Sequence, residues 1–86
     1  MLSIAYEKGG ALVATLQEHR IRRLWSQREL ARRAEVAERT IANAERGERQ
    51  PRLLTMRRIA DALEVDWKEI DEFRLAVTDL EGKVAA

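Results

Sequence analysis

The feature that most constrains the fold of this chain is residues 26–47, where two short amphipathic helical patterns lie only three residues apart. The first pattern, 27–34, places aliphatic side chains on one face and arginines on the other. Ser26 followed by Glu29 is typical of a helix start, because each side chain can accept a hydrogen bond from the other residue's backbone N–H. Val36 lies between the patterns and can hold the two helices at a steep angle. We therefore expect two helices joined by a tight turn.

The second pattern, 38–46, has a narrow apolar face. Little more than Ile41 and Ala44 can face a core, and Gly47 then supplies a residue that readily adopts positive φ at a helix end. Its other face carries hydrogen-bonding side chains, namely Glu38, Arg39, Thr40, Asn43 and Arg46. A short helix of this kind, placed directly after another short helix, predicts a helix-turn-helix whose second helix contacts DNA.

Charge is distributed unevenly along the 86 residues, although the formal net charge is only +1. Residues 20–58 carry twelve arginines against five glutamates, a net of +7, whereas residues 1–19 carry −1 and residues 59–86 carry −5. A basic middle segment is typical of a surface that faces a polyanion, and the acidic end suits a different partner. The charges alone leave a second interpretation open, in which ion pairs such as Glu45 with Arg49 only cover a solvated surface.

The composition argues against several classes of site. The chain has no cysteine, hence no disulfide or thiolate metal site, and one histidine, His19, which we expect to be a partly exposed helix residue. We therefore predict no enzyme activity, no metal site and no cofactor. No apolar run approaches the roughly 20 residues of a membrane-spanning helix. The first residues, MLSIAYEKGG, lack the basic and apolar regions of a signal peptide. These features predict a cytoplasmic protein.

The remaining pattern predicts one all-α domain of five or six short helices. Residues 1–10 are interpreted as an N-terminal arm, either mobile or packed on a second subunit, and residues 11–73 as the domain itself. The tail, 74–86, keeps a helical register at first and is expected to fray from Gly82 onward. It is either a dimer contact or disordered.

Three more helices are expected around the central pair. The first covers 11–24 and includes Arg20 within its apolar register, where a charge needs a buried partner. The fourth ends at about Leu63. Asp66, three residues before Glu69, is another capping signal and predicts the start of a fifth helix.

Three segments fall at the spacing of a known family: SQRELARRA, TIANAERG and QPRLLTMRRIADALEV. Over about Leu12 to Ile70, the chain resembles the Cro/lambda-repressor-like helix-turn-helix family, also called the xenobiotic-response-element type. The resemblance implies a compact lambda-repressor-like DNA-binding domain, in which 27–34 is the second helix and 38–46 is the recognition helix.

The resemblance also implies roles for individual residues. Gln27 would bind a phosphate and brace the recognition helix, and Arg20 would form a buried ion pair with Glu45. The implied base contacts in the major groove are those of Glu38, Arg39, Thr40 and Asn43. The implied phosphate contacts are those of Gln27, Arg28, Arg46, Arg49, Gln50 and Arg52.

Four residues depart from the family pattern. Glu35 replaces the glycine that is common in the turn, and Leu24 replaces a glycine that often ends the first helix. Ala37 replaces the serine or threonine that caps the recognition helix, at an expected cost of about 1 kcal/mol. Arg52 replaces a capping serine before the fourth helix. We expect these changes to affect the angle at which the recognition helix is held.

These observations predict a sequence-specific regulator of transcription, a repressor that binds double-stranded DNA as a homodimer on a palindromic operator. Arg39 could bridge guanine O6 and N7, and Asn43 could pair with adenine N6 and N7. Alternatively, Arg39 binds a phosphate or pairs with Glu35 or Glu38, and Asn43 is an ordinary exposed residue. Glu38 could accept a hydrogen bond from cytosine N4, but we expect it to orient Arg39.

A second function remains open. Members of the family include antitoxins, which neutralise a toxin, and factors that bridge to the transcription machinery. The net charge of −5 over residues 59–86 would suit a basic protein partner such as a toxin.

Overall fold

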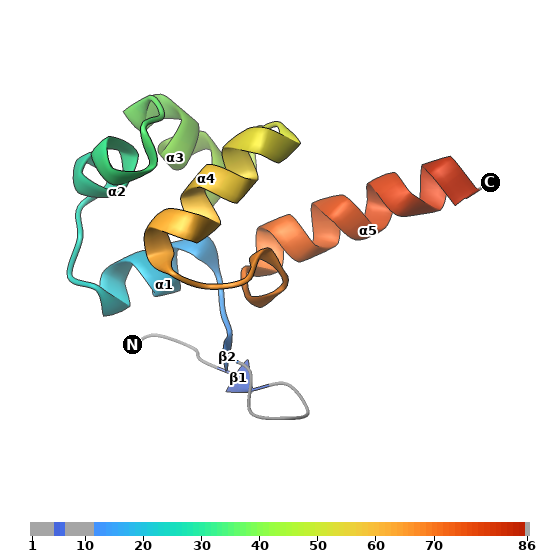
Figure 1. Ribbon diagram of the computed structural model, residues 1–86, viewed down its shortest axis with the longest axis horizontal. Helices are drawn as coiled ribbons and strands as arrows, with labels where there is room; N and C mark the ends of the chain where they lie inside the picture. Colours follow the sequence, from blue (N-terminus) through green and yellow to red (C-terminus); the bar gives the residue numbers. More distant parts are fainter. Residues whose placement is uncertain (1–4, 7–11, 86) are drawn as a thin grey trace.

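The computed structural model describes residues 5–6 and 12–85 and shows an all-α domain with a small β-ribbon (Figure 1). Its elements are β1 (Ala5–Tyr6), β2 (Leu12–Val13), α1 (Leu16–Arg22), α2 (Gln27–Ala34), α3 (Glu38–Arg46), α4 (Leu53–Leu63), the 3-10 helix η1 (Trp67–Glu69) and α5 (Asp71–Ala85). The bounds of α2 and α3 are those expected from the sequence. None of the described helices is long and apolar enough to cross a membrane.

The prediction of a first helix over 11–24 is wrong at both ends, because the observed helix covers only Leu16–Arg22. Leu12 and Val13 form β2, which pairs with β1 in an antiparallel ribbon, and α1 begins only at Leu16. Thr15 caps this start by accepting a hydrogen bond from the backbone N–H of Glu18, whose carboxylate accepts the N–H of Thr15 in return. Of the expected arm, 1–10, only the residues of β1 are described, so the question of a mobile or partner-bound arm falls outside the described residues.

The segment before α1 is extended because it pairs with the start of α5. The N–H of Ala14 donates to the carbonyl of Glu69 at 3.1 Å, and the N–H of Asp71 donates to the carbonyl of Ala14 at 2.9 Å. In addition, Glu72 of α5 accepts the N–H of Leu16 at 2.8 Å. Burial raises the pKa of the Glu72 carboxyl. These contacts join the two ends of the folded domain.

The core is built from one or two large side chains of each α-helix, together with Ile70, which lies between η1 and α5. Leu16, Leu30, Ile41, Ile59, Leu63, Ile70 and Phe73 are fully buried. Val36, in the turn between α2 and α3, packs against this core, as the sequence suggested. His19 is also buried, and its Nε2 donates to the carbonyl of Glu69 at 2.6 Å. The expected partial exposure of His19 is therefore wrong.

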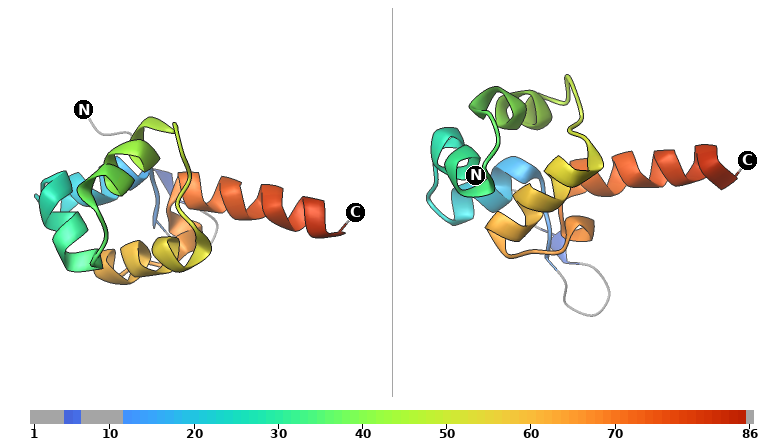
Figure 2. Two further views of the ribbon diagram at one scale, coloured as in Figure 1. Left: turned by 90° about the horizontal axis from the view of Figure 1, so that it is seen from above. Right: turned by 45° about the horizontal axis from the view of Figure 1, so that its top comes forward.

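The C-terminal part of the chain differs most from expectation. The capping signal of Asp66 and Glu69 is real, but it opens the single turn of η1 and not the fifth helix. Ile70 then takes an extended conformation, and α5 begins at Asp71. This helix continues through Gly82, where fraying was expected, and extends away from the other helices (Figures 1 and 2).

Candidate nucleic-acid interface

The turn between α2 and α3 is made by three residues without glycine. Ser26 accepts the N–H of Glu29 at 3.0 Å and so fixes the start of α2, whereas the Glu29 carboxylate binds Arg32 and Arg33 and does not return the capping bond. Glu35 ends α2 in the left-handed conformation with φ 58°. Glu35 thus adopts the left-handed conformation that the usual glycine favours, and such a backbone costs free energy for a residue with a side chain.

The α3 helix contacts the core through only two buried residues, Ile41 and Ala44. Glu38 and Arg39 are exposed near its N-terminus, and Thr40 and Asn43 are half-buried. Ala37 precedes the helix and makes no side-chain capping bond. The first N–H groups of α3 are therefore not capped by a side chain and lie beside the exposed residues, an arrangement that favours anions.

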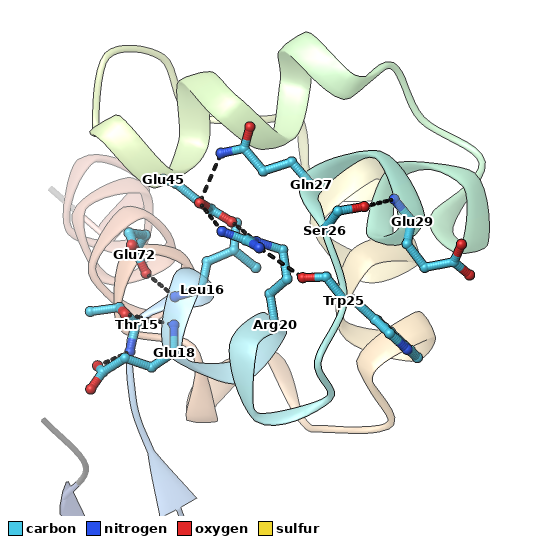
Figure 3. Close-up of polar contacts among 10 residues, drawn as sticks. All are labelled: Thr15, Leu16, Glu18, Arg20, Trp25, Ser26, Gln27, Glu29, Glu45 and Glu72. Carbon is cyan, nitrogen blue, oxygen red and sulfur yellow. Dashed lines mark hydrogen bonds and ion pairs between the residues drawn. The ribbon is translucent and has the colours of Figure 1, made fainter. Parts of the chain in front are cut away.

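Three helices meet at the carboxylate of Glu45, which α3 directs toward the core side (Figure 3). Arg20 of α1 binds both of its oxygens, at 2.6 Å through Nε and 3.1 Å through Nη2, and also donates to the carbonyl of Trp25 at 2.8 Å. Gln27 of α2 donates to the same carboxylate at 3.0 Å. The ion pair and the bracing amide implied by the resemblance are thus both present, and they fix α3 relative to α1 and α2.

The arginines of residues 20–58 form two groups. The first group binds carboxylates: Arg20, Arg23, Arg32, Arg33 and Arg46. The second group has no carboxylate partner among the residues that the structure describes: Arg22, Arg28, Arg39, Arg49, Arg52, Arg57 and Arg58. The expected surface pair of Glu45 with Arg49 does not form, because Glu45 is used in the core. The second group remains free to bind phosphates.

At the surface, two arginines of the first group share the carboxylate of Glu29. Hydrogen bonds from Arg32 and Arg33 lower the pKa of the Glu29 carboxyl, and the carboxylate in turn raises the pKa of Arg32. Arg33 also lies over the ring of Trp25, 4.3 Å from its centroid. For these arginines the interpretation as a solvated, ion-paired surface is the better one.

An open depression of about 360 Å³ lies between α3, the following loop and the start of α4. It is lined by Ala37, Arg39, Thr40, Asn43, Arg49, Gln50, Pro51, Arg52 and Thr55. Three free arginines thus surround one concave surface. Positive charge concentrated in a concave surface attracts a polyanion more strongly than the same charges spread over a convex one.

Comparison with known proteins identifies the family. A family model described as Helix-turn-helix matches residues 16–70, which is more than half of the chain. The chain belongs to this helix-turn-helix family. The resemblance to its Cro/lambda-repressor-like type is confirmed, and the chain is a DNA-binding transcription regulator. The matched region begins where α1 begins and ends just before α5.

A solved relative supports the same assignment. The helix-turn-helix chain is similar to the restriction-modification controller protein C.AhdI from Aeromonas hydrophila, known from a high-resolution crystal structure. The two chains are 30% identical, the similarity covers 63% of this chain and 82% of that chain, and the TM-score is 0.60. No curated protein matches this chain.

Within the helix-turn-helix, the structure brings most predicted DNA contacts to one side of the depression, but not all. Glu38 and Arg46 lie on α3 outside the lining, and Arg28 and Gln27 lie at the start of α2. Thr55 was not predicted, although it lines the depression from the first turn of α4. Its place three residues after Arg52 at an uncapped helix start was the signal that could have identified it.

Proposed function

We propose that this helix-turn-helix protein is a sequence-specific repressor that inserts α3 into the major groove of double-stranded DNA. The observation that carries the proposal is the depression that places Arg39, Thr40 and Asn43 beside the free arginines Arg49 and Arg52. Hydrogen-bonding side chains on a weakly buried helix can reach base edges, while arginines beside it bind the phosphates on either side.

Arg39 is the best candidate for base recognition. It is exposed and has no partner among the described residues, so the alternative in which it pairs with Glu35 or Glu38 has no support in the described contacts. A guanidinium can donate to guanine O6 and N7 together, which is worth about 1–3 kcal/mol of discrimination. Asn43 can bind adenine in the same way. Because no described bond to Arg39 engages it, the Glu38 carboxylate can accept a hydrogen bond from cytosine N4. The Thr40 hydroxyl can donate to a base edge or accept from one.

Phosphate binding is assigned to residues around α3. Gln27 uses one amide hydrogen for Glu45 and retains a second for a phosphate. Arg28, Arg49, Gln50 and Arg52 are exposed and contribute directly. Each phosphate that an arginine neutralises releases counterions, so affinity falls steeply as salt rises.

We further propose a homodimer on a palindromic operator, because one recognition helix contacts too few base pairs to specify a site. The α5 helix carries exposed leucines for such a contact, on different sides of the helix: Leu75 is 64% exposed and Leu80 is 42% exposed. A bound dimer covers its operator and excludes other proteins from it, and this is why repression is proposed. The similarity to a restriction-modification controller supports a regulatory role.

A second function is favoured by the same C-terminal region. The exposed leucines of α5 lie within the segment 59–86 that carries a net charge of −5. An acidic helix with exposed apolar residues suits a basic protein partner, so an antitoxin or a bridge to the transcription machinery is the alternative.

The proposal is tested by selecting binding sites from a random duplex-DNA library, followed by affinity measurements across a salt series. The wild type is expected to enrich a palindrome, and Arg39→Ala and Asn43→Ala are each expected to lose preference at one base-pair position per half-site. Arg22→Ala is the control, because Arg22 is also a free arginine but lines a different hollow. Binding that depends on salt but never on sequence would overturn the proposal and favour the protein-partner function.

A further inference from the structure

Arg46 links the proposed base-contacting residue Asn43 to a carboxylate outside the helix. Its Nη2 donates to Oδ1 of Asn43 at 2.8 Å, one turn earlier in α3. Its Nε lies 3.2 Å from Oε1 of Glu48, just beyond the end of the helix at Gly47. The three side chains therefore form a chain of contacts beside the depression.

Only one edge of the guanidinium is used in these contacts. Arginine has five N–H donors; the hydrogen bond to Asn43 uses one on Nη2, and Nε faces the Glu48 carboxylate as an ion pair. The donors on Nη1 remain free. Arg46 can thus hold Asn43 and bind a phosphate at the same time, and its assigned phosphate contact is compatible with both the hydrogen bond and the ion pair.

The contact with Arg46 determines which way the Asn43 amide faces. If the amide were rotated by half a turn, its NH₂ group would meet the N–H of Arg46, and two donors would face each other. Oδ1 is therefore held toward Arg46, and Nδ2 is directed to the other side. The amide presents a donor at a defined position and keeps one lone pair of Oδ1 for an additional bond.

We propose that Arg46 and Glu48 form a positioning pair that fixes the amide of Asn43 and so sets which base this residue selects. The inference rests on the proposed insertion of α3 into the major groove. A fixed donor selects a base edge with an acceptor, which in the major groove is purine N7, guanine O6 or thymine O4. Adenine satisfies the amide best, because its N6 amino group can also donate to the free lone pair of Oδ1.

Stability is not the main consequence of this pair. The side chains of Arg46 and Glu48 are 56% and 61% exposed, and ion pairs at that exposure contribute little to folding. Direct phosphate binding cannot be the role of Glu48 either, because a carboxylate repels the DNA backbone. The position and charge of Glu48 do allow it to hold Arg46 in a fixed orientation.

The test compares Arg46→Gln with Arg49→Gln in the selection from a duplex-DNA library. Both variants lose one positive charge, and both are expected to weaken binding to all sequences and to reduce its salt dependence. Only Arg46→Gln should also lower the preference at the base pair that Asn43→Ala identifies, by about tenfold. Glu48→Gln should lower the same preference while strengthening overall binding.

Two further measurements separate the possible outcomes. In the Asn43→Ala background, Arg46→Gln should change affinity but no base preference. In the free protein, hydrogen exchange of the Arg46 Nε–H, followed by NMR, should be slower than that of the unpaired Arg49 and should speed up in Glu48→Gln. Equal loss of preference in Arg46→Gln and Arg49→Gln, or equal exchange of the two arginines, would overturn the positioning pair. No enrichment by the wild type would instead overturn the proposed function on which the inference rests.

Discussion

The carboxylate of Glu45 joins three helices, and this makes it the most consequential single residue of the domain. Its side chain is 5% exposed and that of its partner Arg20 is 11% exposed, so both charges are largely removed from water. Arg20 and Gln27 occupy both oxygens. A buried pair of this kind adds little net stability compared with apolar residues, but removing one partner is costly because the other charge stays buried. Glu45 thus positions α3 for DNA more than it strengthens the fold.

We predict that Glu45→Gln destabilises the domain by about 3–5 kcal/mol, because it leaves the guanidinium of Arg20 buried without a counter-charge. A loss of that size is a large part of the total stability of a small domain, about 5–15 kcal/mol. Urea denaturation followed by circular dichroism measures it. Glu29→Gln is the matched control: it removes a carboxylate that binds two arginines at the surface, and solvent screening should make its effect much smaller. Similar losses in the two variants would contradict the special role of Glu45.

The helix boundaries show which parts of the fold the sequence could predict. The start of α2 was predictable, because Ser26 caps it through a bond to a residue only three positions away. The apolar face of α3, with two buried residues, was also predictable. The start of α1 was not, because the bonds of Ala14 to residues 55 and 57 positions away, just before and at the start of α5, hold the preceding segment extended. For the same reason the capping signal at Asp66 produced only one turn: Ile70 is buried and extended beside Ala14. In the candidate site, side-chain types were predictable, but their partners were not, as the bond from Arg46 to Asn43 shows.

The α3 helix offers a test of capping at the scale of one element. Ala37 has the extended backbone of an N-cap residue but no side-chain bond, whereas Ser26 in the equivalent position of α2 makes one. We predict that Ala37→Ser stabilises the domain by about 1 kcal/mol and that Ser26→Ala destabilises it by a similar amount. The midpoint of thermal unfolding should move in opposite directions in the two variants. No change in Ala37→Ser would mean that the turn holds this position away from capping geometry.

At the scale of the whole molecule, a basic surface and an acidic helix meet at the loop residues 50–52. The arginines without carboxylate partners in the described chain lie within residues 20–58, whereas α5 is acidic, projects from the domain and lies outside the region matched by the helix-turn-helix family. Along α5, Phe73 is fully buried and Val77 packs against the core, but Leu80 in the same register lies beyond it and is 42% exposed. A hollow of about 370 Å³ lies between Leu80 and Ala76 of α5, the start of α4 and the loop residues 50–52, which also line the depression beside α3. The apolar face of α5 therefore continues past the core of its own chain.

We predict that a second copy covers this face, so that Leu80→Glu converts a dimer into a monomer in sedimentation velocity. A charge placed in an apolar contact must be dehydrated without a partner, which costs more than the contact returns. Leu24→Glu is the control, because Leu24 is 91% exposed at the end of α1, so this variant should leave the sedimentation unchanged.

Binding to DNA distinguishes loss of the dimer from unfolding. On a duplex with one half-site, Leu80→Glu should weaken binding only slightly, because the new carboxylate shares a hollow with Gln50 and Arg52. On a palindrome it should in addition lose the gain in affinity that two linked recognition helices provide. A wild type that sediments as a monomer at high concentration, with and without a palindromic duplex, would instead assign the exposed face of α5 to a different protein.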